Sequence, residues 1–137
     1  MTIVLALFLA FADVGSLKAE PNLTKRSDLA LDNANRALDD ARAAYQAGNI
    51  KKADAELDEV KESVDVSLDA LENSGQQPRN SKYYKRAEIA LRKLARRLSG
   101  FRDEMSVDDR KPLDDVATRV QDVHDRLLSE IMTKKKR

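Results

Sequence analysis

The sequence contains no cysteine, and this absence removes several classes of protein at once. Disulfide bonds, lipid-modified cysteines, thiolate metal sites and haem attached through a cysteine motif all need a residue that the chain lacks. The absence does not assign a cellular compartment, because a helical domain with a sufficient core is stable without disulfides. The fold must therefore be stabilised without covalent cross-links.

Glycine, proline and aromatic residues are also scarce. The 137 residues include 4 Gly and 3 Pro, aromatic residues make up 4%, and charged residues make up 36%. This composition is typical of charged helical assemblies, and the length suits one domain with a modest core. The formal net charge is only +1, so no whole-protein field attracts nucleic acid or membranes. Any electrostatic function must come from local segregation of charge.

Motifs that carry chemistry are missing as well. No glycine-rich phosphate loop occurs, and no serine has a histidine and a carboxylate arranged near it. The single histidine, His124, follows Gln121 by three residues, whereas a di-metal bundle needs paired Glu-x-x-His elements. Haem held by Met and His is disfavoured, because Met105 and Met132 fall at helix ends. We therefore expect a protein that is not an enzyme and has no catalytic, cofactor-binding or metal-binding residues.

The first twenty residues differ in composition from the rest. The apolar run at residues 3–12 is shorter than the roughly 20 residues of a membrane span, and it fits the core of a secretory signal. Small residues place cleavage after Ala12 or after Ala19; we favour Ala19 and predict a signal peptide at residues 1–19. No Lys or Arg precedes the run, so the free amino terminus supplies the positive charge or the true start lies upstream. The alternative is an N-terminal core helix.

The remaining sequence repeats one hydrophobic period four times. In the third segment Leu91, Leu94, Leu98 and Phe101 are three or four residues apart, so they share one helix face. The pattern predicts an all-α fold, an up-down-up-down four-helix bundle. Splayed hairpins, or an extended hairpin that dimerises, are the alternatives. The predicted helices cover about residues 24–47, 50–73, 81–105 and 109–132, within a single helical-bundle domain at 20–137 that ends in a basic tail at 133–137.

The turn between the first two predicted helices has a recognisable pattern. Gly48 suits the left-handed residue after a helix, and the next residue, Asn49, suits a cap. Residues 44–57 resemble the internal turn of a tetratricopeptide-type hairpin, with Tyr45, Gly48, Ile50 and Ala53 in matching order. The resemblance covers this one turn, and the repeat period does not recur along the chain. We interpret it as a helical hairpin.

Opposite charges are concentrated on the second and third predicted helices. Residues 50–73 contain three lysines and eight acidic residues, a net charge of −5, and residues 81–104 contain the reverse, a net charge of +5. Consecutive helices are neighbours in an up-down bundle. Folding back at the intervening loop then predicts two ion pairs at the rim, Asp54–Arg102 and Glu56–Arg97, each contributing about 0.2–1 kcal/mol.

Most other cations of the third helix fall at outward heptad positions. They predict a candidate interaction surface for an unknown protein or another acidic partner. The alternative is a solvated charged face. Nucleic acid is disfavoured, because export removes the opportunity and Tyr83 alone offers an outward aromatic ring for stacking. The heptad seams also allow a homodimer. The surface comprises Lys82, Lys85, Arg86, Ile89, Arg92, Lys93 and Arg96.

Together these observations predict an exported, non-catalytic helical-bundle protein. It would act as a binding or structural module, secreted or periplasmic, with no transmembrane span in the mature protein. The first helix places Ala34 and Ala41 at core positions, so it either packs closely or leaves a groove. A groove there gives the alternative function, a small-ligand carrier with a cavity in the bundle core. A closed core would favour the interaction module.

Overall fold

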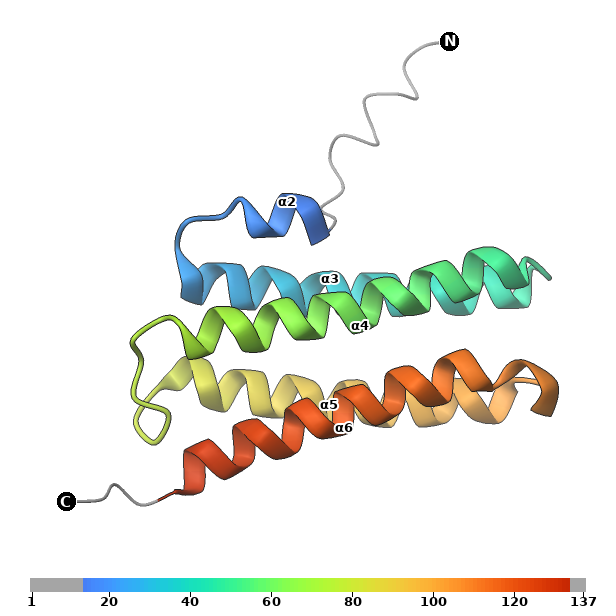
Figure 1. Ribbon diagram of the computed structural model, residues 1–137. Coiled ribbons are helices and arrows are strands. Elements are labelled where there is room, and N and C mark those ends of the chain that lie inside the picture. The colour runs from blue at the N-terminus through green and yellow to red at the C-terminus, as the bar shows by residue number, and fades with distance from the viewer. Residues whose placement is uncertain (1–13, 134–137) are drawn as a thin grey trace, which may run out of the picture.

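The computed structural model describes residues 14–133, which are helical with no strand among them (Figure 1). The predicted all-α class and the four long helices are confirmed, with bounds within two residues of those expected. The last helix starts later than predicted because a separate 3₁₀ turn precedes it. The elements are α2 (Val14–Lys18), α3 (Leu23–Gln46), α4 (Ile50–Glu72), α5 (Lys82–Glu104), η1 (Val107–Asp109) and α6 (Lys111–Met132).

The helices begin and end where the sequence supplies suitable residues. The side chain of Asn49 accepts a hydrogen bond from the Lys52 N–H at 3.1 Å and caps α4. Ser81 caps α5, because its hydroxyl accepts from the Tyr84 N–H at 3.3 Å. Gly48 has a φ of +83°, a left-handed conformation that residues with a side chain rarely adopt. The turn expected at Gly48 and the cap expected at Asn49 are therefore confirmed.

The apolar stripes of α3, α4, α5 and α6 meet in one buried cluster. Leu57, Leu91 and Leu98 are fully buried, and the stripe predicted for α5 is buried along its length. Complete burial of one such side chain contributes about 1.5–3 kcal/mol. At one end Phe101 meets Tyr45 edge to face, with ring centroids 5.9 Å apart. The largest fully buried side chains also include Leu17, Leu38, Leu71, Leu94, Leu113 and Leu127.

The long helices pack as two hairpins, α3 with α4 and α5 with α6, lying one over the other (Figure 1). Between the hairpins, α3 packs along α5 and α4 packs along α6, whereas α4 and α5 barely touch. Arg86 pairs with Asp28 near the starts of α5 and α3, and Arg119 pairs with Asp65 between α6 and α4. Around the core the order is therefore α3, α4, α6, α5, which leaves α4 and α5 at diagonal corners.

The expectation that all consecutive helices are neighbours is thus wrong for α4 and α5. Residues 73–81 form a polar connection of nine residues, long enough to carry the chain across the end of the core. Hydrophobic burial is satisfied equally well by a neighbouring or a diagonal helix, because every stripe faces the same core. Basic side chains of α5 instead form ion pairs with carboxylates on α3 and α6.

Small residues line the seam between α3 and α4. Ala34 and Ala41 have no exposed surface, so the alanine face of α3 packs closely against its neighbour. The buried hydroxyls of Ser27 and Ser67 lie 2.7 Å apart, which requires close approach of the two helices. Of the two outcomes expected for this face, the structure has close packing.

The short helix α2 lies against α3 and α4. Leu17 is 2% exposed, and it forms a small apolar cluster with Val14, Ala30 and Val66. The favoured prediction, a signal peptide at residues 1–19, assigns this stretch no place in the fold, whereas its alternative was an N-terminal core helix. Residues 1–13 of that segment, like the last four residues of the tail, lie outside the described residues. None of the helices in residues 14–133 combines the length and the apolar content that a bilayer span requires.

Gly100 lies within α5, where glycine is unfavourable. A Cβ atom added at this position would have no neighbouring atom within 4 Å. A residue with a side chain would therefore fit here without a clash. The φ of Gly100 is not positive, in contrast to Gly48 and Gly75. The helix therefore gains neither space nor conformation from this glycine.

Gly100→Ala is expected to raise the free energy of unfolding by about 0.5–1 kcal/mol, because alanine restricts the unfolded chain and favours helix. Urea denaturation followed by circular dichroism measures the change. Gly48→Ala serves as the control and is expected to lower stability, because its φ is +83°. A loss of stability at position 100 would contradict the open environment described for it.

Candidate interaction surface

All seven residues of the predicted surface are exposed along the outer side of α5. Residues three and four positions apart share one helix face, so these residues form a second stripe that faces solvent while the leucines of α5 face the core. We call this set the basic face: Lys82, Lys85, Arg86, Ile89, Arg92, Lys93 and Arg96.

Two of its six cations are already paired within the chain. The Arg86 guanidinium lies 2.6 Å from an Asp28 carboxylate oxygen on α3. Arg92 donates two hydrogen bonds to Glu88, at 3.0 and 2.7 Å. These carboxylates raise the pKa of both arginines, so the two guanidinium groups stay charged at physiological pH.

The other four cations have no carboxylate partner among the described residues. Lys85, Lys93 and Arg96 make no ion pair there, and Lys82 lies over the ring of Tyr83, with Nζ 5.4 Å from the ring centroid. Arg86 lies over the same ring at 5.2 Å. Tyr83 is thus occupied by the chain's own cations, a role that sequence analysis did not assign to it.

A groove of about 300 Å³ runs along the seam between α3 and α5, beside the basic face. Ile89, which is 44% exposed, and Ala90 supply its apolar surface, and Arg86 and Lys93 lie at its edges. Charged side chains around an accessible apolar surface suit a partner that carries both carboxylates and an apolar side chain.

Neither rim ion pair predicted between α4 and α5 forms. Arg97 pairs with Asp39 on α3 and donates to Asn35 at 2.6 Å. Arg102 lies 2.6 Å from Asp114 on α6. Both predictions, Asp54–Arg102 and Glu56–Arg97, are wrong, because α5 has α3 and α6 as its neighbours and lies diagonal to α4.

An opposite concentration of charge lies on α4. Asp54, Asp58, Glu62 and Asp69 follow one side of this helix and make no ion pair with any described residue. We call these four carboxylates the acidic face. Partial burial, then the negative charges of Asp109 and Asp58, raise the pKa of Asp54. Asp54 thus lies close to other negative charges at one end of the acidic face.

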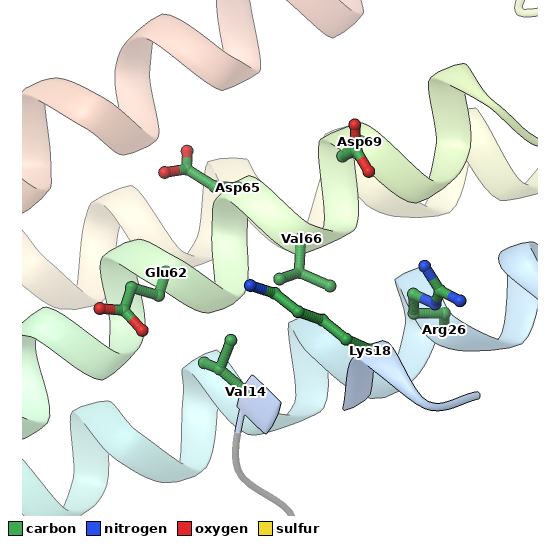
Figure 2. A pocket seen from close by; sticks show the side chains of 7 residues that line it. All are labelled: Val14, Lys18, Arg26, Glu62, Asp65, Val66 and Asp69. Atoms are coloured by element: carbon green, nitrogen blue, oxygen red, sulfur yellow. The ribbon is translucent and has the colours of Figure 1, made fainter. Parts of the chain in front are cut away.

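A second groove, of about 400 Å³, separates α2 from the middle of α4 (Figure 2). The Lys18 side chain extends over Val66 toward the carboxylates of α4 (Figure 2). Arg26, on the same side, donates two hydrogen bonds to the Glu20 carbonyl, at 2.9 and 2.7 Å. The groove is therefore a mixed-charge cleft at the edge of the acidic face. Its lining comprises Val14, Lys18, Arg26, Glu62, Asp65, Val66 and Asp69.

The single histidine belongs to the seam between α5 and α6. His124 Nε2 lies 2.8 Å from a Glu88 carboxylate oxygen, and both side chains are largely buried. Hydrogen bonds from Arg92 and from His124 lower the pKa of Glu88 against the opposing effect of burial. His124 thus helps to hold a buried carboxylate ionised. Among residues 14–133 no cluster of three or more potential metal ligands occurs.

Two carboxyl groups meet where α4 and α6 end. Arg126 Nε lies 2.7 Å from Glu72 and 3.5 Å from Glu130. Burial, then the hydrogen bond to Glu72 and its charge, raise the pKa of Glu130 to about 7. Burial and the same two carboxyls raise the pKa of Tyr84 to about 12, and its hydroxyl donates to the Leu71 carbonyl at 3.3 Å. Glu130 therefore titrates near neutral pH.

No protein-family model, no curated protein and no solved structure matches this chain. Function is therefore inferred from the chain's own residues.

Glu130→Gln is expected to change how stability depends on pH. Glu130 has a higher pKa in the folded than in the unfolded chain, so its contribution to the free energy of unfolding is full below about pH 4.5 and is lost as the pH rises through about 7. Glutamine does not titrate. At about pH 8 the free energy of unfolding of the variant is expected to exceed that of the parent by on the order of 1 kcal/mol, a figure discounted for the partial exposure of Glu130. The difference is expected to disappear toward about pH 5.

Urea midpoints across this pH range measure the difference between the two proteins. Asp122→Asn provides a matched control on α6, since Asp122 is exposed and makes no ion pair with the described residues. A constant difference between Glu130→Gln and the parent at every pH would show that Glu130 does not titrate in this range.

Proposed function

We propose that the chain is an exported, non-catalytic helical-bundle module that binds an acidic macromolecular partner through the basic face. The supporting observation is the four cations of this face that lack a carboxylate partner among the described residues. Like charges three and four residues apart repel one another and cost helix stability. The nearby carboxylate of Glu88 is buried and held by Arg92 and His124, so it does not relieve this repulsion.

The scaffold proposed for this face is an up-down-up-down bundle with a crossed connection between α4 and α5. The ion pairs of α5 with α3 and with α6 support this arrangement. Packing on two sides keeps α5 straight and fixes the spacing of its outward cations, which reduces the entropy lost when a partner binds.

An acidic protein surface suits the basic face better than nucleic acid does. Nucleic-acid grooves combine cations with aromatic rings on which bases stack, and Tyr83 is covered by Lys82 and Arg86. The groove at Ile89 adds an apolar contact that a protein side chain can fill. The partner is therefore proposed to present carboxylates around an apolar side chain.

The alternative function is a small-ligand carrier with a cavity in the core. The two grooves described above are lined by charged side chains at helix surfaces. Ala34 and Ala41, where this alternative places the cavity, are buried in the seam between α3 and α4. These positions support the interaction module over the carrier.

Charge reversal on the basic face tests the proposal. The parent is expected to bind a labelled glutamate-rich peptide containing leucine at low salt, with affinity that falls as salt rises. The combined variant Lys85→Glu, Lys93→Glu and Arg96→Glu is expected to bind about tenfold or more weakly, because each site turns attraction into repulsion. Fluorescence anisotropy measures both affinities.

The matched control reverses three exposed lysines on other helices: Lys25→Glu, Lys51→Glu and Lys111→Glu. It has the same net charge as the first variant and is expected to stay within about threefold of the parent. Equal losses in the two variants would mean that net charge, and not the basic face, governs binding. Absence of binding by the parent at low salt would refute the proposal.

Export is tested by the amino terminus of the protein purified from its native host. Mass spectrometry is expected to show cleavage after Ala19 or after Ala12, so that the chain begins at Glu20 or at Asp13. The first product lacks α2 and its buried Leu17, and the second retains them. An intact Met1 would contradict the proposed signal peptide.

A further inference from the structure

The ion pairs at the seams leave opposite charges at opposite corners of the molecule. On α5, Arg86 is neutralised by α3 and Arg92 by the buried Glu88, which leaves the other four cations of the basic face. On α4, Asp65 pairs with Arg119 and Glu72 with Arg126. Glu56 lies within ion-pair distance of Arg36 and Lys52, and Glu59 accepts hydrogen bonds from Asn33 and from the Val14 N–H. The four carboxylates of the acidic face remain. The two remaining sets cannot neutralise each other within one chain, because α4 and α5 lie diagonally across the core.

The two faces match in length as well as in sign. The basic face runs from Lys82 to Arg96, about 21 Å at 1.5 Å per residue, and the acidic face from Asp54 to Asp69, about 23 Å. Each lies along a single helix, the basic face on α5 and the acidic face on α4 (Figure 1). The two faces can therefore lie along each other over nearly their whole length, with opposite signs of charge in contact.

We propose that the basic face of one molecule docks on the acidic face of a second copy of this chain. The inference rests on the proposed function, because it names the acidic partner as α4 of another molecule. A symmetric contact through either face would place like charges opposite one another, which is unfavourable. The contact is therefore heterologous, and a docked pair retains one free basic face and one free acidic face, on different molecules, for further copies.

The contact is weak and salt-dependent. Exposed ion pairs contribute little each, and they are screened at physiological salt. Lys51 and Lys61 lie among the acidic residues of α4, and Lys18 of α2 approaches these acidic residues. The negative charge of the acidic face is therefore partly compensated. Ile89 supplies the one large exposed apolar side chain of the basic face. Association is thus expected at high protein concentration and low salt.

Two charge-reversed variants of the full chain test the contact. One carries Lys85→Glu, Lys93→Glu and Arg96→Glu, and both of its faces are acidic. The other carries Asp58→Lys, Glu62→Lys and Asp69→Lys, and both of its faces are basic. Sedimentation velocity at low salt is expected to show that the parent associates. The association constant of each variant alone is expected to be lower by about tenfold or more, and association is expected to return when the two variants are mixed. Raising the salt to about 0.5 M is expected to abolish the recovery.

Circular dichroism shows whether each variant folds. A variant that does not fold is replaced by its neutral counterpart, Lys85→Gln with Lys93→Gln and Arg96→Gln, or Asp58→Asn with Glu62→Gln and Asp69→Asn. A neutral variant is expected to associate weakly by itself. It is also expected to associate weakly when it is mixed with the charge-reversed variant of the other face. Association of equal strength in parent and variants would overturn the inference, because a different surface would then be responsible.

The outcomes separate this inference from the proposed function. A parent that binds the glutamate-rich peptide but does not associate at low salt overturns the self-association and leaves the proposed function standing. A parent that neither binds the peptide nor associates overturns both. Loss of association in both variants with recovery on mixing supports both.

Discussion

The structure depends on the mutual burial of four apolar stripes, since no helix of this chain can bury its own. Each long helix contributes leucine, valine or alanine at three- and four-residue spacing to the same cluster. Burial of that cluster decides which side of each helix faces solvent. The position of every surface charge follows from it: once Leu91 and Leu98 are in the core, Lys85, Lys93 and Arg96 must point outward.

The path of the chain between α4 and α5 determines which of these charges meet. A neighbouring placement would have set eight acidic residues of one helix against eight basic residues of the next. The diagonal placement instead distributes the cations of α5 between α3 and α6, through Arg97 with Asp39 and Arg102 with Asp114. The surplus of each sign remains on the surface, where it is available to other molecules.

Local features of the chain were predictable from the sequence, and the relations between distant elements were not. The period of the apolar residues, Gly48 and Asn49 act within a few residues, so the helix positions, the turn and the cap of α4 followed from them. The seven residues of the basic face were also found by their period, and they are exposed as expected. The neighbours of α5 depend on the route of residues 73–81, for which two placements bury the same apolar surface. The pairing of Glu72 with Glu130 follows from that route and carried no sequence signal.

The polar groups buried between α3 and α4 have a consequence for how these helices slide past each other. Asn33 donates to Ser63 at 2.8 Å and to Glu59 at 2.7 Å, and the Val14 N–H donates to the same Glu59 carboxylate at 3.2 Å. A shift of one helix by a single turn would leave these groups desolvated and without partners, whereas alanine against alanine would tolerate it. The alanines permit the close seam, and the amide, hydroxyl and carboxylate fix its axial register.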